Sequence, residues 1–549
     1  MRAESYQDAK NRFIRFLKKL TDKSWLSRIF QPRCVSDLQT EPGVLMIQID
    51  GLSYQQIQKA FSKNRLPYLR RLSENRGYHL KRFYSGMPST TAAVQAELFY
   101  GVKSSVPAIS FYDREQEKKE ILLFPVSANN IARQLESLGK PLLKGGTSYS
   151  NIFTGGAETA RYCIQTMKLR SMRHLASSVK MFIILALQPS KFFRMWGYGV
   201  LETGLALYDF FRGVGKGRDF FKELKFVPTR ILICILLREL IRIRVKMDLA
   251  RGVRIVHASF LGYDEQSHRR GPDSAFAHWT LKGIDAVIRD IHHRAKKSKC
   301  LKYQLIVYSD HGQELAVSFE KRFGKTLEEA IKEAVMKANR DTGLSGSQEK
   351  RENRILRRRA RGMFFKQTQK DEYRIKNGLD GIMITALGPI GHVYLGSSLA
   401  SGDKARMAEA LVNEAKIPMV LFTSKNRVIA QNKKGCFDPE VSFSEILGED
   451  HPLSKQTARD LVEICHHPDA GDFVISGWTP EEQPMTFAVE NGAHGGPGRE
   501  ETSGFVLIPQ SMDKTDEVFR PLDLRALIFR LLEKDEEKKS PGNMIKGLR

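Results

Sequence analysis

The stretch Tyr303-Gln304-Leu305-Ile306-Val307-Tyr308 runs directly into Ser309-Asp310-His311-Gly312. Its length and its β-branched and aromatic residues predict a buried strand, so Asp310 and His311 are expected at the carboxyl end of that strand. A carboxylate oxygen and an imidazole nitrogen are both ligands that zinc accepts. Gly312 lets the chain turn away without crowding them. A strand-ending turn with an incidental histidine is the alternative interpretation of this motif taken alone.

Two further segments repeat the pattern of a strand followed by an aspartate. Residues 44–49 predict a buried strand that ends at Asp50, and residues 253–261 predict one that leads to Asp264 and His268. An aspartate and a histidine four residues apart can reach one ion from a single helical turn. Open α/β sheets place their sites at the carboxyl ends of their strands. We therefore expect these side chains to lie together.

A cluster of hydroxyls lies between the first two of these strands. Ser89, Thr90 and Thr91 precede an alanine-rich helical stretch that Gly101 closes, so any of the three could be a simple helix N-cap. The same position would put a hydroxyl at the positive end of a helix, where an alkoxide or a phosphate is stabilised.

His494 is the last candidate ligand, in a glycine-rich loop before a predicted strand at residues 504–508. A turn residue is the alternative, but beside the other candidates we interpret His494 as a ligand. Three aspartates, three histidines and one nucleophile-capable hydroxyl are the inventory of a two-metal phosphoryl-transfer site. The candidate ligands are Asp50, Asp264, His268, Asp310, His311 and His494.

In this order and context, the set resembles the alkaline phosphatase superfamily, most closely its type I phosphodiesterase/nucleotide pyrophosphatase branch. The resemblance covers residues 44–113, 253–312 and roughly 380–510. It implies an α/β fold with a central, mostly parallel sheet flanked by helices, into which basic helical insertions are placed. The family's Pro-Thr-x-Thr segment and the glycine that ends its helix fit residues 88–101 without a gap, which implies Thr91 as the nucleophile.

The resemblance also implies two divalent metal ions, with zinc as the expected metal. Asp50, Asp310 and His311 would hold one ion together with the Thr91 oxygen, and Asp264, His268 and His494 would hold the other. One departure concerns an asparagine that normally follows the nucleophile helix and helps to hold a phosphate oxygen. Residues 106–113 contain none, and Ser110 could replace it only in part.

The activity implied is metal-dependent hydrolysis of phosphoric esters, as a phosphodiesterase or phosphatase. The alternative on the same site is a transferase of the phosphoethanolamine or phosphoglycerol type. The alternative from another class is a non-enzymatic protein that binds a membrane or nucleic acid on a phosphatase scaffold. The complete ligand set argues against this last interpretation, because a binding protein has no reason to keep a metal site.

The net charge of +26 is concentrated in three segments. Residues 1–33 carry 9 Lys/Arg against 3 Asp/Glu, residues 166–250 carry 16 against 6, and residues 349–376 carry 11 against 4. The rest of the chain is nearly neutral, which argues against nucleic acid as a partner. In residues 13–30 and 229–249 apolar residues recur at helical spacing among the cations, which is typical of helices on an anionic membrane surface. A buried helical hairpin is the alternative for residues 229–249, and a surface helix packed on the main domain is the alternative for the N-terminal segment.

Neither a secretory signal nor a membrane-spanning stretch is visible in the sequence. The six cysteines are far apart and form no Cys-x-x-Cys pair, so free thiols are expected. We therefore expect a cytoplasmic protein that is peripheral on the inner membrane face.

The expected organisation is a catalytic core interrupted by basic insertions. A basic amphipathic segment (1–40) precedes the first core segment (41–165), and a basic helical insertion (166–250) separates it from the second core segment (251–320). A basic charged insertion (321–378) then leads to the third core segment, which includes a small cap-like subdomain (379–549).

Overall fold

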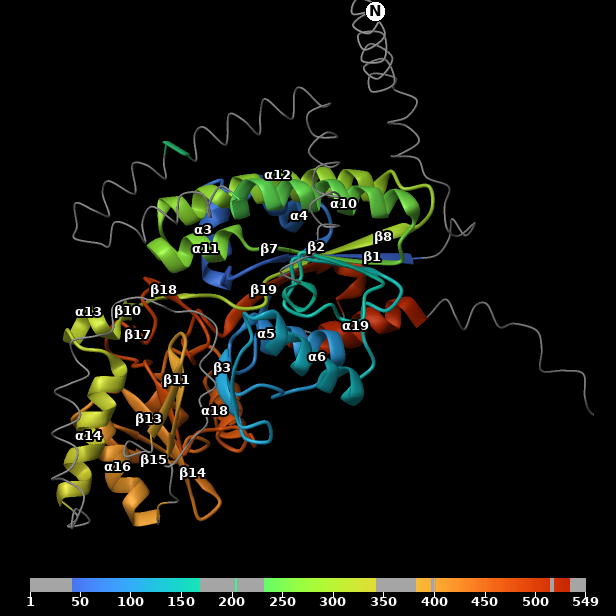
Figure 1. Cartoon of the computed structure of the whole chain (residues 1–549). Helices are drawn as coiled ribbons and strands as arrows, with labels where there is room; N and C mark the ends of the chain where they lie inside the picture. The colour runs from blue at the N-terminus through green and yellow to red at the C-terminus, as the bar shows by residue number, and fades with distance from the viewer. Residues whose placement is uncertain are drawn as a thin grey trace, which may run out of the picture.

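The computed structural model describes residues 42–167, 203–204, 232–341, 382–395, 399, 401–513 and 518–533. These residues form two β-sheets with helices packed on them (Figure 1). The expected amphipathic segment at residues 1–33 and the basic run at 349–376 lie outside the described residues, so both remain predictions. The expected domain boundaries also remain a prediction.

A seven-stranded sheet forms the centre, in the order β2-β19-β8-β1-β7-β5-β6. β1 pairs in parallel with β7 and β8, and β5 in parallel with β6 and β7, whereas β19 is antiparallel to both β2 and β8. The expected central, mostly parallel sheet is therefore confirmed. Its strands are β1 (Pro42–Ile49), β2 (Tyr78–Tyr84), β5 (Thr147–Tyr149), β6 (Thr159–Arg161), β7 (Ile255–Phe260), β8 (Lys302–Tyr308) and β19 (Ser503–Pro509).

Helices cover both faces of this sheet (Figure 1). Along β1, Val44 and Met46 pack into one hydrophobic core while Leu45, Ile47 and Ile49 pack into the other. Because both faces are buried, the strand has a continuous apolar sequence without alternation. One face carries α3 (Tyr54–Ser62), α4 (Pro67–Asn75), α10 (Arg238–Arg251) and α12 (Ala275–Lys296), and the other carries α5 (Thr91–Tyr100), α6 (Pro125–Leu138) and α19 (Pro521–Glu533).

The described part of the basic segment 229–249 corrects one expectation, because α10 lies in the core. Ile241, Val245 and Leu249 pack among the core residues under α12. Arg242 is buried and pairs with Glu239 at 2.7 Å and with Asp290 of α12 at 2.6 Å. These acidic partners allow an arginine-rich helix to be buried, so the apolar face of α10 is not available to a membrane.

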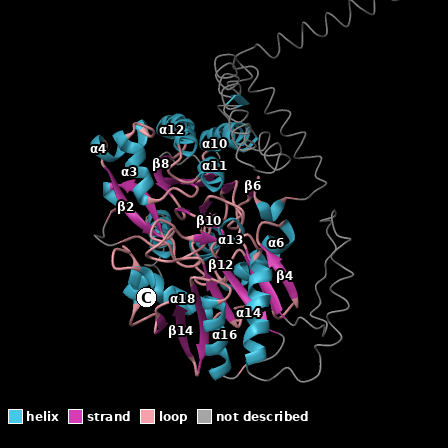
Figure 2. Cartoon of the chain, turned by 90° about the vertical axis from the view of Figure 1, so that its left-hand side faces the viewer, coloured by secondary structure: helices cyan, strands magenta, loops and turns pink. Residues whose placement is uncertain are grey.

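A second sheet of six strands is antiparallel throughout, in the order β11-β12-β16-β13-β14-β15. Figure 2 shows it below the central sheet, with α14 (Leu327–Asp341) and α16 (Ser401–Asn413) beside it. The opposite face packs on α17 (Phe443–Leu447) and α18 (Ser454–Cys465). Its strands are β11 (Ile382–Ala386), β12 (Ile390–Leu395), β13 (Met419–Ser424), β14 (Arg427–Asn432), β15 (Gly435–Phe437) and β16 (Phe473–Ser476).

Short elements connect the two sheets around the candidate site. Two-stranded pairs are formed by β9 (Glu314–Leu315) with β18 (Gly492–Ala493), by β10 (Val317–Ser318) with β17 (Met485–Thr486), and by β3 (Ser110–Asp113) with β4 (Lys118–Ile121). The remaining helices are a π-helix (Leu232–Leu237), α11 (Gly262–Arg270), α13 (Phe319–Phe323) and two 3₁₀ turns (Ile164–Thr166, Gln510–Met512). No described helix has the length and apolar character needed to cross a bilayer.

A buried ion cluster also joins the two sheets. Arg520, just before α19, donates from Nε to Glu97 of α5 at 2.8 Å and from an Nη to Asp460 of α18 at 2.9 Å. Asp460 further accepts from the hydroxyl of Tyr84 in β2 at 2.8 Å and pairs with Lys103 at 3.0 Å. The cluster thus ties the helix that follows the candidate nucleophile to a helix of the antiparallel sheet.

One cysteine departs from the expectation of free thiols. Cys300, just before β8, is disulfide-bonded. The other described cysteines, Cys163, Cys234, Cys436 and Cys465, are free.

Candidate metal centre

Three carboxylates converge at the carboxyl ends of the adjacent central strands β8, β1 and β7. Asp50 follows β1, Asp310 lies two residues beyond β8, and Asp264 lies in α11 just after β7. Gly51 has φ +71°, and a Cβ on it would lie 2.4 Å from Oδ1 of Asp264. A glycine is therefore needed here, both for the backbone conformation and for the close approach of the Asp264 carboxylate.

The three neighbouring hydroxyls have three different roles in the structure. Thr90 is the N-cap of α5, since its side chain accepts from the backbone N–H of Ala93 at 3.3 Å. Ser89 donates to the carbonyl of Gly496 at 2.7 Å and accepts from the N–H of Gly495 at 3.1 Å, so it holds the loop that carries His494. Thr91 is the first residue of α5, and its Oγ1 faces the carboxylates.

The Thr91 hydroxyl lies within reach of two expected ligands. Its Oγ1 is 3.1 Å from Nε2 of His311 and 3.4 Å from Oδ1 of Asp50. Of the three hydroxyls that the sequence left open, Thr91 is thus the one beside the expected ligand set. Its position at the first turn of α5 also places it in the field of the helix N-terminus.

Each of the three histidines has its Nδ1 next to an acceptor outside the centre. Nδ1 of His311 lies 3.0 Å from the carbonyl of Gly312, and Nδ1 of His494 lies 3.1 Å from that of Ser89. Nδ1 of His268 lies 2.9 Å from the carbonyl of Gly492 and 2.8 Å from Oε2 of Glu490. Protons on the three Nδ1 atoms would leave each Nε2 as the free electron pair for a metal ion.

The structure brings the expected ligands together, although their assignment to individual ions remains a prediction. Ligand atoms of Asp50, Asp310 and His311 lie within 4.8 Å of one another, and so do those of Asp264, His311 and His494. The rings of His311 and His494 stack at 3.8 Å. His268 lies at the edge of this set, with Nε2 3.2 Å from Oδ2 of Asp264 and its ring 5.0 Å from that of His494.

Burial and mutual repulsion dominate the electrostatics of these carboxylates. Burial raises the pKa of Asp50 well above its ordinary value, and the charges of Asp310 and Asp264 raise it further. For Asp264, burial also raises the pKa, but His268 beside it outweighs this and the net pKa is lowered. Burial lowers the pKa of His494 well below its usual value, with His311 adding to the effect. Converging buried carboxylates that repel one another form an environment that favours a divalent cation.

Asp310 gives an independent indication that the residues fit a metal ion. The residue is fully buried, and among the described residues neither of its carboxylate oxygens has a hydrogen-bond partner. Nε2 of His311 lies 3.5 Å from Oδ2 of Asp310, and a buried carboxylate without hydrogen-bond partners is costly unless a cation pairs with it. The donor set of carboxylate oxygens and imidazole nitrogens matches what zinc binds.

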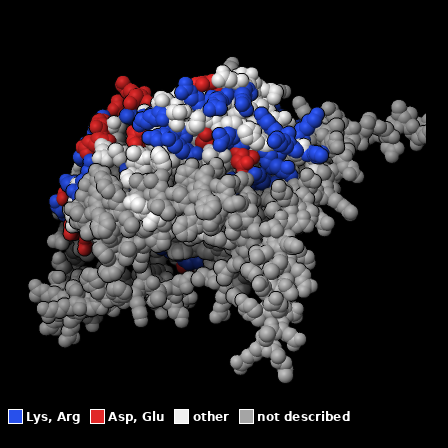
Figure 3. Space-filling view, turned by 90° about the horizontal axis from the view of Figure 1, so that it is seen from above, with Lys and Arg blue, Asp and Glu red and all other residues white. Residues whose placement is uncertain are grey.

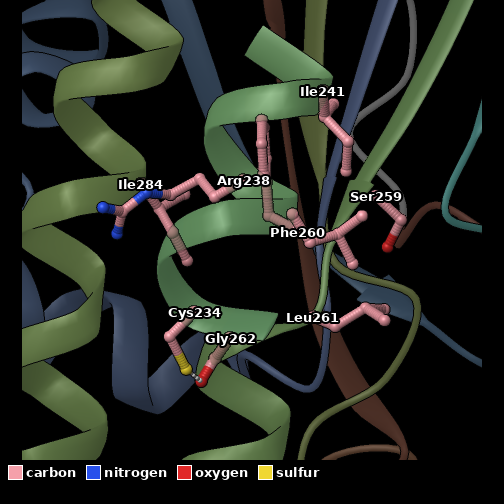
Figure 4. A pocket seen from close by; sticks show the side chains of 9 residues that line it. Cys234, Arg238, Ile241, Ser259, Phe260, Leu261, Gly262 and Ile284 are labelled. Atoms are coloured by element: carbon pink, nitrogen blue, oxygen red, sulfur yellow. Dashed lines mark hydrogen bonds between the residues drawn. The ribbon is translucent and has the colours of Figure 1, made fainter. Parts of the chain in front are cut away.

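Some residues that the sequence does not mark contact the candidate ligands, or the helix that carries two of them, on the side away from the centre. The side-chain amide of Gln313 donates to Oδ1 of Asp264, and Glu490 contacts His268. Cys234 of the π-helix donates to the carbonyl of Gly262 at 3.7 Å (Figure 4). It also accepts from Gln266 at 3.4 Å, and the two contacts hold the start of α11. No local motif marks these contacts, because most of them join segments far apart in the chain.

Ser110, the expected partial substitute for the family's asparagine, lies in β3. Its side chain is buried, and within the described residues its hydroxyl has no hydrogen-bond partner. A role for Ser110 in holding a phosphate oxygen remains a prediction.

Comparisons with known proteins agree with the motifs. Residues 236–380 match the family model described as type I phosphodiesterase / nucleotide pyrophosphatase. This segment contains Asp264, His268, Asp310 and His311. A search among curated proteins finds no match.

A search of solved structures finds matches that include three structures of low sequence identity. Phosphonoacetate hydrolase from Sinorhizobium meliloti 1021, in complex with phosphonoformate, is 12% identical with a TM-score of 0.44, covering 89% of this chain and 95% of that one. Murine ectonucleotide pyrophosphatase/phosphodiesterase 5, an inactive form in complex with AMP, is 11% identical with a TM-score of 0.44, covering 90% and 95%. The human protein of the same name is 11% identical with a TM-score of 0.45, covering 89% and 95%.

The family match confirms the resemblance to type I phosphodiesterases/nucleotide pyrophosphatases over residues 236–380. Residues 236–380 are thus similar to type I phosphodiesterases/nucleotide pyrophosphatases, and the described residues include two groups able to hold a metal ion.

Proposed function

We propose that the protein hydrolyses phosphoric esters by two in-line displacements, with Thr91 as the nucleophile. The observation that carries this proposal is the position of the Thr91 hydroxyl, 3.1 Å from His311 and 3.4 Å from Asp50, while Thr90 takes over the cap of α5. A hydroxyl that is not needed for the helix cap is free to attack phosphorus.

We further propose two zinc ions as the cofactors, held by Asp50, Asp310, His311 and the Thr91 oxygen on one side and by Asp264, His268 and His494 on the other. When bound, such ions lower the pKa of a coordinated hydroxyl and offset the charge on the phosphoryl and leaving-group oxygens. The unpartnered oxygens of Asp310 and the outward-bonded Nδ1 atoms of the histidines support this element of the proposal.

The chain's own groups then have defined roles. The Thr91 proton has an acceptor in reach, Oδ1 of Asp50 at 3.4 Å, whereas the lone pair on Nε2 of His311 is the one that would bind the metal ion. The N-terminus of α5 stabilises negative charge that develops on the Thr91 oxygen and on the phosphoryl group. In the second displacement, water attacks the phosphorylated Thr91 from the side that the leaving group vacated.

The test is turnover of bis-p-nitrophenyl phosphate by the full chain, first stripped with a chelator and then titrated with Zn²⁺. We expect no turnover in the stripped protein and recovery as about two equivalents of zinc are added. Equal turnover with and without the chelator would contradict the proposal. Adding ethanolamine or glycerol in the same assay distinguishes the alternative, because a transferase would form a p-nitrophenyl diester of the added alcohol in place of p-nitrophenyl phosphate.

We also propose that the protein works at the surface of an anionic membrane. Support comes from residues 13–30, whose apolar and cationic residues alternate at helical spacing. Lys and Arg also gather over the described helix layer of the central sheet (Figure 3), where the exposed cations include Arg71, Arg76, Lys282, Arg289 and Lys296. Each basic residue near an anionic leaflet contributes about 1 kcal/mol.

Co-sedimentation with vesicles tests this placement. We expect the full chain to pellet with vesicles rich in phosphatidylserine and to stay in solution with phosphatidylcholine vesicles. A chain that lacks residues 1–33 should pellet less well. Equal recovery in solution with both lipids would contradict the membrane proposal without affecting the proposed chemistry.

A further inference from the structure

The three histidines of the candidate metal centre differ in what holds them. His311 and His494 each have Nδ1 beside a neutral backbone carbonyl, that of Gly312 and that of Ser89. Nδ1 of His268 also lies beside a carbonyl, that of Gly492 at 2.9 Å, but in addition it has a carboxylate, Oε2 of Glu490, at 2.8 Å. His268 is thus the one of the three whose Nδ1 has both a carbonyl and an acidic partner among the described residues.

Glu490 is itself fixed in position. Its other oxygen, Oε1, accepts from the hydroxyl of Thr486 at 2.6 Å. The side chain of Glu490 is 14% exposed, so its charge is largely shielded from water. Because a hydrogen bond is electrostatically stronger where water is excluded, this carboxylate is a strong acceptor for the Nδ1–H of His268.

The segment that carries Glu490 is attached to α11 at several points. The backbone N–H of Asn491 donates to the carbonyl of His268 at 2.7 Å, and its side-chain amide donates to the carbonyl of Arg269 at 2.6 Å. On the other side of the imidazole, Nε2 of His268 faces Oδ2 of Asp264 at 3.2 Å. The row Thr486, Glu490, His268, Asp264 therefore runs from β17 to the centre in fixed contacts.

We propose that Glu490 is a positioning residue of the metal centre, which orients His268, keeps the proton of its imidazole on Nδ1, and makes Nε2 the stronger metal ligand. A carboxylate behind a metal-binding histidine has these effects, and its loss costs metal affinity about 10- to 100-fold. The inference rests on the proposed function, since it concerns the ion that Asp264, His268 and His494 would share. It also goes beyond that proposal, because it assigns unequal dependence to the two ions.

The experiment measures zinc binding directly and needs no substrate. The full chain is stripped of metal and titrated with Zn²⁺ in a calorimeter, with a competing chromophoric chelator to bring the affinities into range. In Glu490→Gln, which keeps the shape but removes the charge, we expect one of two binding events to weaken about 10- to 100-fold and the other to stay unchanged. Thr486→Val, which leaves the carboxylate in place but releases Oε1, should weaken the same event by a smaller factor.

A control variant and a second readout separate a positioning role from general destabilisation of the protein. Glu482→Gln makes the same charge change in the same segment on a side chain that is 58% exposed, and both events should match the unsubstituted chain. Loading each variant with Co²⁺ gives a second readout, because the visible absorption of cobalt reports its ligand geometry. We expect Glu490→Gln to change this spectrum at the first or the second equivalent, whichever occupies the His268 site.

The outcomes distinguish this inference from the proposed function. If the unsubstituted chain binds two zinc ions and Glu490→Gln binds both with unchanged affinity and spectrum, the positioning role of Glu490 is wrong while the proposed function stands. If both events weaken together in Glu490→Gln, the unequal dependence is wrong. If the unsubstituted chain takes up no zinc, the proposed two-metal function fails, and this inference fails with it.

Discussion

The two sheets contribute to the candidate site in different ways. The central sheet and its flanking helices supply Asp50, Asp310 and His311 after β1 and β8, Asp264 and His268 on α11 after β7, and Thr91 on α5. The strands of the antiparallel sheet supply none of the candidate ligands. Their contribution is the β11–β12 turn, where a Cβ on Gly388 would lie 2.9 Å from the carbonyl of His494.

This turn restrains the loop that carries the last ligand. Pro389 packs against Gly495 and Gly496, and the backbone carbonyl of Pro389 accepts from the N–H of Gly477 in the antiparallel unit. The ends of the central strands thus position five of the six candidate ligands, whereas the loop of His494 is held both by Ser89 and by the β11–β12 turn of the antiparallel sheet. The difference predicts which substitutions should abolish turnover and which should only reduce turnover, stability or metal affinity.

The largest effect is expected at Thr91, on the central sheet side. Thr91→Ala should lower turnover of bis-p-nitrophenyl phosphate by about a thousandfold or more, because the nucleophile is lost. Zinc content, measured by atomic absorption, should stay near that of the unsubstituted chain, because six protein ligands remain.

Thr90→Ala is the matched control for Thr91→Ala. It removes the N-cap hydroxyl one residue away and should cost about 1 kcal/mol of stability with most of the turnover kept. If Thr90→Ala were inactive and Thr91→Ala active, the assignment of roles along residues 89–91 would be wrong. Ser89→Ala should fall between the two, because Ser89 holds the His494 loop.

The next largest effect is expected where the two sheets are joined. Arg520→Met leaves Glu97 and Asp460, which are 5% and 2% exposed, without their main cation. Stranding buried carboxylates in this way costs about 3 kcal/mol, so the thermal midpoint in calorimetry should fall by several degrees. Arg530→Met, at an exposed position on α19, should leave the thermal midpoint unchanged. An equal effect of both substitutions would show that the ion cluster does not join the sheets.

A smaller effect is expected at Gly388, in the β11–β12 turn that packs against the loop of His494. Gly388→Ala adds a Cβ 2.9 Å from the carbonyl of His494 and should lower turnover or zinc affinity about tenfold, because it displaces this one ligand. Gly435→Ala is the matched control, since Gly435 also has a positive φ in the same sheet but nothing lies within 4 Å of its Cβ position. Both substitutions strain the backbone. A similar loss of function in both variants would mean that backbone strain, and not displacement of His494, causes the loss.

The comparison also explains what the sequence could predict. The strands at 44–49, 253–261 and 303–308 are predicted almost to their observed ends, because burial on both faces produces continuous apolar runs. The structure also brings together the residues that follow these strands. In the antiparallel sheet, strands such as β14 (Arg427–Asn432) carry polar residues and are defined by pairing partners that no local pattern shows.

The missed features have the same physical origin. Arg242 is expected at a surface until its partner Asp290, 48 residues further on, is known. Glu490 lies 222 residues from His268 and has no motif around it. Ligands at strand ends can be located from local sequence, whereas the residues that neutralise or position other side chains depend on contacts between distant segments.

The smallest predicted effect is the change in stability that Asp310→Asn causes. This change should be a gain without metal and a loss with metal. Both oxygens of Asp310 are buried without hydrogen-bond partners among the described residues, so in a chain stripped of metal Asp310→Asn, which removes the charge, should raise stability by about 1 kcal/mol. The proposed zinc ions would stabilise the unsubstituted chain by binding the folded state, and Asp310→Asn should lose much of that gain. Thermal unfolding with chelator and with excess Zn²⁺ measures both values.

An Asp310→Asn chain that is less stable than the unsubstituted chain under both conditions would mean that the Asp310 carboxylate has a stabilising role without a cation. The lack of hydrogen-bond partners at the Asp310 oxygens would then no longer favour a metal ion at this end of the central sheet.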